Sequence, residues 1–127
     1  MNRRFFGLAV GTGLLIALPL AASAQQGRAG PKIFISVDME GIGGVGSPNM
    51  TASSGGKDYD VARRLMTDEL NTVIRAAYDA GAGYVLVNDS HGDHQNALHT
   101  ELDPRADYIQ GSIKRLGMVA GLDGTFD

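Results

Sequence analysis

Residues 32–41, KIFISVDMEG, decide the fold of this 127-residue chain. The first six, Lys32–Val37, form a β-branched and aromatic run that is typical of a buried strand. A second apolar run, GYVLVN at Gly83–Asn88, follows a helix that we expect from about Asp58 to Ala80, with Gly81 placed to end it. Strand, helix and strand in this order predict a right-handed βαβ unit whose two strands are parallel.

The expected helix carries one apolar stripe at helical spacing, which we assign to the core: Met66, Leu70, Val73, Ile74 and Ala77. A long loop, Gly41–Gly56, precedes the helix. After the second strand we expect a short helix at Gln95–Leu102, with Ala97, Leu98 and Leu102 facing inward, and a third short strand at Asp107–Gln110. The predicted fold class is therefore α/β, a three-layer type of parallel sheet built from βαβ units and incomplete in this chain.

The N-terminus has the three parts of a secretory signal peptide. Arg3 and Arg4 make its start basic, an apolar run covers Gly7–Ala21, and Ala22-Ser23-Ala24 is a small-residue cleavage site. The apolar run is shorter than the roughly 20 residues of a spanning helix, so no stable membrane anchor is expected. We predict a signal peptide at 1–24, a flexible lead-in at 25–31, and a periplasmic or secreted protein exported by the general or the twin-arginine route.

Composition excludes several classes of function. The chain has 11 basic and 14 acidic residues, a net charge of −3, and no basic run that could neutralise a phosphate backbone, so nucleic acid is not an expected partner. It also has no cysteine, which excludes disulfides and thiolate chemistry. Any metal ion must therefore be held by carboxylate and imidazole groups.

Polar residues follow both predicted strands at the edge of the sheet where ligands bind in open parallel sheets. The first strand runs into Asp38-Met39-Glu40 and the second into Asp89-Ser90-His91. Residues i and i+2 of an extended chain point to the same side, and neighbouring strands are about 5 Å apart, so Asp38, Glu40 and His91 can converge. Two carboxylates and an imidazole suit Zn²⁺ or Mn²⁺, with Asp38 placed to bridge two ions. Asp89 is expected either to support His91 from outside the ligand set or to cap the next helix.

Simpler explanations exist for the same residues. A D-x-E sequence after a strand is common, and Asp89-Ser90-His91 alone could be a helix cap. His94 lies three residues after His91, in a turn that we expect to be exposed, and His99 is expected on the surface of the short helix. The combination at two strand ends is what favours a shared site.

Several motifs in their order along the chain resemble the D-aminopeptidase family of dinuclear zinc enzymes. The first is SVDMEGIGG at Ser36–Gly44, followed by RLMTDE at Arg64–Glu69 and VNDSHG at Val87–Gly92. LDPRAD, IQG and MVAGLDGTFD follow at 102–107, 109–111 and 118–127. The resemblance covers nearly all of residues 32–127, which we expect to be the N-terminal part of such a metallopeptidase domain.

The resemblance implies that Asp38 is a ligand shared by two zinc ions and that Glu40 and His91 are further ligands. It also implies a homo-oligomer that removes N-terminal D-amino acids, such as D-alanine, from short peptides. In that family a further histidine ligand, a glutamate ligand and a histidine proposed to act in catalysis come from the half that follows. No catalytic residue is therefore expected within this chain, and we expect a truncated form with little activity by itself.

The same residues also fit two other functions. One is a metal-dependent phosphohydrolase that uses Asp38 and Glu40 on Mg²⁺ and does not need His91. The other is a non-catalytic envelope protein that binds metal or a partner.

Overall fold

The computed structural model describes residues 30–127. The predicted signal peptide, 1–24, and most of the predicted lead-in, 25–31, lie outside the described residues. Among the residues that are described, no helix has both the length and the apolar character needed to cross a membrane.

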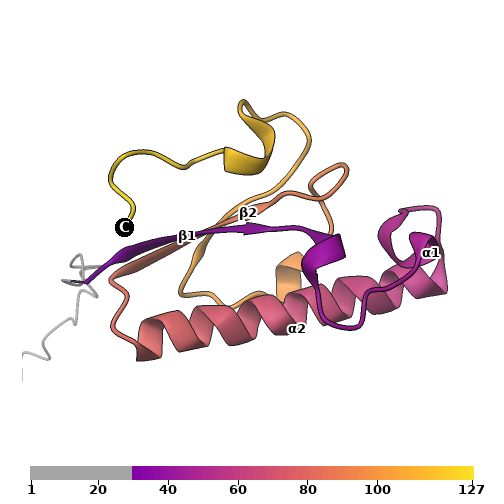
Figure 1. The fold of residues 1–127 in the computed structure, drawn as a ribbon, viewed down its shortest axis with the longest axis horizontal. Coiled ribbons are helices and arrows are strands. Elements are labelled where there is room, and N and C mark those ends of the chain that lie inside the picture. Colours follow the sequence, from indigo (N-terminus) through magenta and orange to yellow (C-terminus); the bar gives the residue numbers. More distant parts are fainter. Residues whose placement is uncertain (1–29) are drawn as a thin grey trace, which may run out of the picture.

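A three-stranded parallel sheet forms the centre of the described chain (Figure 1). Its strands are β1 (Lys32–Val37), β2 (Tyr84–Asp89) and β3 (Asp107–Ile109), in the order β1-β2-β3. Val85 and Val87 on one face of β2 and Leu86 on the other are all buried, as a strand covered on both faces requires. The predicted α/β class and its parallel βαβ unit are confirmed.

Helix α2 (Lys57–Asp79) crosses between β1 and β2 and covers one face of the sheet (Figure 1). Asp58 and Asp60 lie in its first turn, where they complement the helix dipole, and Gly81 follows its end with φ +100°. Its apolar stripe supplies the largest part of the core. Met66 and Ile74 have no exposed surface.

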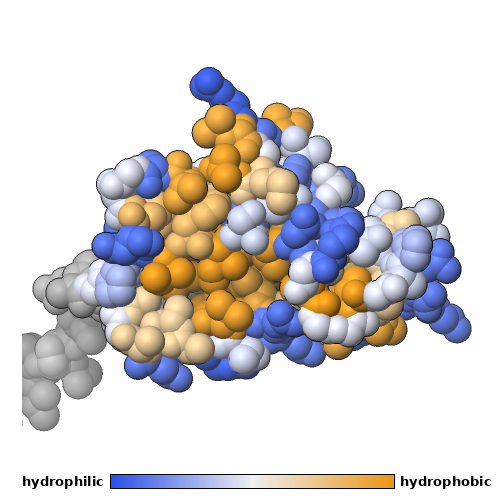
Figure 2. Space-filling model, in the orientation of Figure 1, coloured by the Kyte–Doolittle hydropathy of each residue, from blue (hydrophilic) through white to orange (hydrophobic). Residues whose placement is uncertain are grey.

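Val73 is an exception to the predicted stripe, because 45% of its surface is exposed. It lies at the outer side of β1, where the described sheet ends and no further strand covers the helix. Apolar surface is visible on this side of the molecule, between α2 and the C-terminal segment (Figure 2). The helical spacing was therefore right, but one member of the stripe extends past the edge of the sheet.

The second face of the sheet is covered by the C-terminal segment, residues 111–127, and not by a long helix (Figure 1). Its only regular element is a 3₁₀ turn at Gly117–Val119. Phe126 packs edge-on against Phe34 with ring centroids 5.7 Å apart, and the amide of Asp127 donates to the carbonyl of Lys32 at 3.0 Å. Helix, sheet and irregular segment make the three layers.

Two connections differ from the sequence prediction. The loop before α2 contains a short helix, α1 (Pro48–Thr51). The expected helix at 95–102 is wrong, since only a 3₁₀ turn, His99–Glu101, forms there. The amides of residues 96–98 are bonded to side chains of Asp89 and Thr67 instead of helical carbonyls, so this segment lies flat against β2 and α2.

Met66→Ala should destabilise the protein by about 2–5 kcal/mol, because it leaves a cavity between α2 and the sheet. The free energy of unfolding is measured by urea titration. Met118→Ala makes the same chemical change at a side chain that is 50% exposed, and it should cost much less. Equal losses in the two variants would contradict the described core.

Candidate metal centre

The candidate site lies where β1 and β2 end side by side. In the parallel register Val37 is opposite Asp89, and the amide of Ser90 donates to the carbonyl of Val37 at 2.8 Å. The hydrogen-bond ladder thus continues one residue past the strands and fixes the directions in which the segments after β1 and β2 leave the sheet. Asp38 and His91 follow directly at this edge.

A 3₁₀ turn at Met39–Gly41 places the two carboxylates. Met39 has no exposed surface and anchors the turn in the core, so Asp38 and Glu40 on either side of it remain at the surface. The amide of Gly41 closes the turn on the carbonyl of Asp38 at 3.1 Å. The carboxylates therefore converge through a tight turn, and not through the extended backbone assumed from the sequence.

The imidazole of His91 lies between these carboxylates. Its Nδ1 atom is 2.9 Å from Oδ1 of Asp38 and also 2.9 Å from Oε2 of Glu40. One potential ligand atom from each of the three residues lies within 4.8 Å of the other two. Ligands of one tetrahedral ion at about 2.0–2.2 Å are about 3–4 Å apart, so the donor set and its spacing fit a divalent cation.

Exposure increases from the imidazole outward. The side chain of His91 is 15% exposed, that of Asp38 37% and that of Glu40 61%. An ion held here would therefore be supported by protein on the histidine side. The carboxylate side is open to solvent.

The electrostatics of the cluster are those of crowded negative charge. Burial, together with the neighbouring carboxyl of Glu40, raises the pKa of Asp38. The pKa of Glu40 is in turn lowered, chiefly by the hydrogen bond between Glu40 and Asp38. For His91 burial opposes the charged form, but the Thr51 carbonyl and the two carboxylates outweigh burial and raise its pKa. Such a cluster favours a positive charge at its centre.

Asp89 is buried, with 1% of its surface exposed, and makes no hydrogen bond to the His91 ring. Its Oδ2 accepts from the amides of Asn96 at 2.6 Å and Ala97 at 3.0 Å, and its Oδ1 accepts from Nδ2 of Asn96 at 2.9 Å. The same Nδ2 donates to the carbonyl of His91 at 2.6 Å. Asp89 therefore acts on the main chain of His91, through Asn96.

The other two histidines lie outside the cluster. His94 has a left-handed backbone, φ 62°, and its Nδ1 donates to the carbonyl of Asp89 at 2.9 Å. His99 is exposed in the turn that follows. Within residues 30–127, Asp38, Glu40 and His91 are the only group of acidic and histidine side chains with metal-ligand spacing.

Three supporting contacts were not predicted from the sequence. The carbonyl of Thr51 accepts from Nε2 of His91 at 2.7 Å. Glu69 of α2 accepts from the amide of Gly43 at 2.9 Å and so holds the chain that leaves the 3₁₀ turn. Lys114 donates to Oδ1 of Asn88 at 2.6 Å and to the carbonyl of Asp89. Only α1, which carries Thr51, has a sequence signal, a proline at its first position after Ser47.

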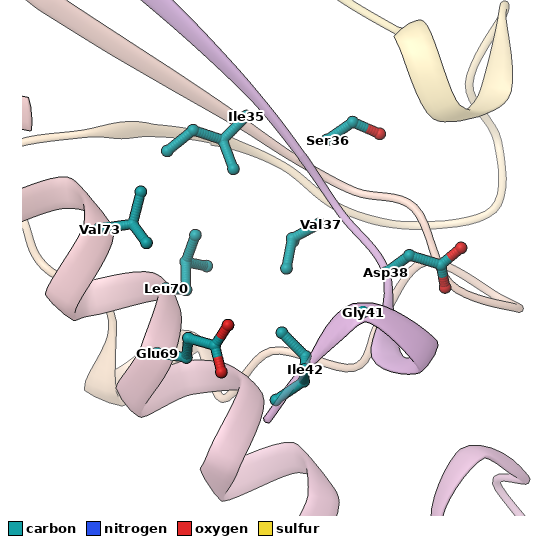
Figure 3. Close-up of a pocket in the computed structure, with 9 residues that line it drawn as sticks. All are labelled: Ile35, Ser36, Val37, Asp38, Gly41, Ile42, Glu69, Leu70 and Val73. Atoms are coloured by element: carbon teal, nitrogen blue, oxygen red, sulfur yellow. The ribbon is translucent and has the colours of Figure 1, made fainter. Parts of the chain in front are cut away.

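A pocket of about 180 Å³ opens beside Asp38, between β1 and α2. Ile35, Val37, Leu70 and Val73 line it with apolar side chains (Figure 3). The carboxylate of Asp38 points away from this pocket (Figure 3). Asp38 therefore borders the pocket, but its carboxylate belongs to the cluster of potential metal ligands.

Comparison with known proteins agrees with this geometry. Residues 32–127 match the family described as D-aminopeptidase, peptidase family M55. A D-aminopeptidase of Bacillus subtilis (strain 168) is 46% identical over 96 residues, which are 75% of this chain and 34% of that protein. The chain thus spans about a third of the relative's length.

A solved structure also matches, that of the Zn-dependent D-aminopeptidase DppA from Bacillus subtilis, described as a self-compartmentalizing protease. It superposes with a TM-score of 0.71 at 44% identity, over 75% of this chain and 34% of that chain. The βαβ unit, the converging ligands and the family match over residues 32–127 lead to one conclusion: this chain belongs to the D-aminopeptidase family of metallopeptidases, M55.

Proposed function

We propose that this chain contributes half of a dinuclear zinc site to an exported aminopeptidase that removes N-terminal D-amino acids, such as D-alanine, from short peptides. The observation that carries the proposal is the convergence of Asp38, Glu40 and His91 within 4.8 Å at the ends of β1 and β2. Zinc dependence is a stated property of the solved relative. The signal-peptide pattern of residues 1–24 supports export to the periplasm or beyond the cell.

Each of the three residues has a distinct role in holding zinc. Asp38 leads the turn and would be the ligand shared by the two ions, as the family resemblance implies. Glu40 and His91 would each bind one of the ions. A bound zinc ion supplies polarisation of the scissile carbonyl and a water of lowered pKa. The exposed carboxylate side leaves room for the substrate to approach.

Three protein ligands, one of them shared, leave both ions short of the four that zinc usually takes. The described residues offer no further ligand group. We therefore propose that additional ligands and the group acting in catalysis come from polypeptide beyond Asp127, and that residues 30–127 alone hydrolyse peptides weakly or not at all. The relative's description as self-compartmentalizing supports a homo-oligomer for the complete enzyme.

The purified protein should retain zinc after dialysis against a trace of the metal, and it should lose zinc when one ligand is removed. We expect Asp38→Asn, Glu40→Gln and His91→Ala each to weaken zinc binding by more than the roughly 10–100-fold typical of residues that only support a ligand. Binding is measured by competition with a chromogenic chelator.

Two exposed residues outside the cluster provide matched controls. Asp79→Asn, at the far end of α2, and His99→Ala should bind zinc as the unaltered protein does. Zinc binding that is insensitive to His91→Ala, together with a preference for Mg²⁺, would instead favour a phosphohydrolase that uses Asp38 and Glu40.

Activity should appear when the remaining part of a D-aminopeptidase is supplied together with this chain. The assay compares alanine release from D-Ala-D-Ala and L-Ala-L-Ala, with the chain alone, with the added part alone, and with both. We expect D-selective hydrolysis only with both, and loss of that activity in Asp38→Asn. No activity in any mixture, with zinc still bound, would favour a non-catalytic metal-binding protein.

A further inference from the structure

The imidazole of His91 is held between two different kinds of acceptor. Its Nδ1 faces the carboxylates of Asp38 and Glu40, and its Nε2 is 2.7 Å from the main-chain carbonyl of Thr51. A carbonyl oxygen can only accept a hydrogen bond, so Nε2 carries a hydrogen whether the ring is neutral or charged. An ionised carboxylate is also only an acceptor, so without a metal ion Nδ1 carries a hydrogen as well. A metal ion between the carboxylates would take the place of that hydrogen and bind the lone pair of Nδ1, while Nε2 keeps its hydrogen on the Thr51 carbonyl.

We propose that the carbonyl of Thr51 sets the tautomer and orientation of His91, so that Nδ1 is its metal-binding atom and α1 is a positioning element of the metal centre. The metal-binding half of this inference rests on the proposed zinc site. Histidine ligands commonly donate their second ring nitrogen to such an acceptor, which fixes the ring and raises its basicity.

The main chain and the ring of His91 are held by separate groups. The side-chain amide of Asn96, which also donates to Asp89, donates to the carbonyl of His91 and holds the His91 main chain in place. The carboxylate oxygens of Asp89 accept from Asn96 and Ala97, and neither contacts the ring. The carbonyl of Thr51 contacts the ring of His91 on the side opposite Asp38 and Glu40. Support of the ring from outside the ligand set is the role that the sequence suggested for Asp89.

Helix α1 is itself fixed in place. The amide of Ala52 donates to the carbonyl of Pro48 at 3.0 Å and so closes the last turn of the helix. Met50 packs against the core. The returning chain passes so close that a Cβ atom on Gly55 would lie 1.7 Å from the carbonyl oxygen of Asn49. Only glycine allows this approach, and α1 packs against α2.

The tautomer is measured first, by long-range ¹H–¹⁵N spectra of the ¹⁵N-histidine-labelled protein, with His91→Ala identifying the signals. In the metal-free protein we expect hydrogen on both ring nitrogens, since Nδ1 faces the carboxylates and Nε2 faces the Thr51 carbonyl. After loading with ¹¹³Cd²⁺ we expect cadmium coupling at Nδ1 only. Absence of hydrogen from Nε2 in either form, or cadmium coupling at Nε2, overturns the inference. Hydrogen on Nε2 without any bound cadmium overturns the zinc site proposed above, while the Thr51 contact stands.

Proline substitution tests α1 without altering a ligand. Ala52→Pro removes the amide that closes α1 and disfavours the helical conformation of Thr51, so it redirects the Thr51 carbonyl. We expect zinc affinity to fall about 10–100-fold. Ser53→Pro is the matched control, because Ala52 before it is already extended (φ −89°, ψ 128°) and Ser53 is the second residue of the Ala52–Gly55 turn, where proline is favoured.

A second pair keeps the test decisive if Ala52→Pro does not fold. Gly55→Ala forces α1 to move, whereas a Cβ on Gly46 meets nothing within 4 Å. Zinc affinity should fall in Gly55→Ala and stay unchanged in Gly46→Ala, with the unfolding midpoints of the metal-free proteins showing that both are folded. Equal zinc affinity within each pair overturns the role of α1.

Discussion

Parallel pairing of β1 with β2 is the constraint on which the arrangement of the site depends. The register that sets Val37 opposite Asp89 continues through the bond from Ser90 to the Val37 carbonyl. Two chain segments separated by more than 50 residues therefore leave the sheet side by side, with Asp38 on one and His91 on the other. A shift of one residue in this register would turn the strand residues to the opposite faces and separate the two side chains.

Burial of the Asp89 carboxylate reinforces this edge. An ionised group without partners would be costly inside the protein, but Asp89 accepts two main-chain amides and one side-chain amide from the following loop. On the other face, Asn88 and Ser90 bond to the carbonyls of Gly117 and Met118. The end of β2 is thus held from the loop and from the C-terminal segment, which keeps the His91 main chain fixed before any ion binds.

Regular elements and strand ends were predictable because each depends on neighbouring residues. The apolar run of Lys32–Val37 and the stripe around Met66 carry their own periodicity, and both appear in the structure within a residue or two. The segment 95–102 was not predictable in this way. Its amides are bonded by Asp89 and by Thr67 of α2, and neither partner is adjacent in sequence.

The sequence by itself determined the α/β class, the position of the carboxylates and imidazole after the strands, and the family, because these follow from local patterns and ordered motifs. Only the tertiary structure decided which atom of His91 faces Asp38 and Glu40, and that Thr51, and not Asp89, contacts the other side of the ring. That contact joins residues 40 positions apart through a main-chain carbonyl. Every residue carries such a carbonyl, so its identity as a partner is set by folding alone.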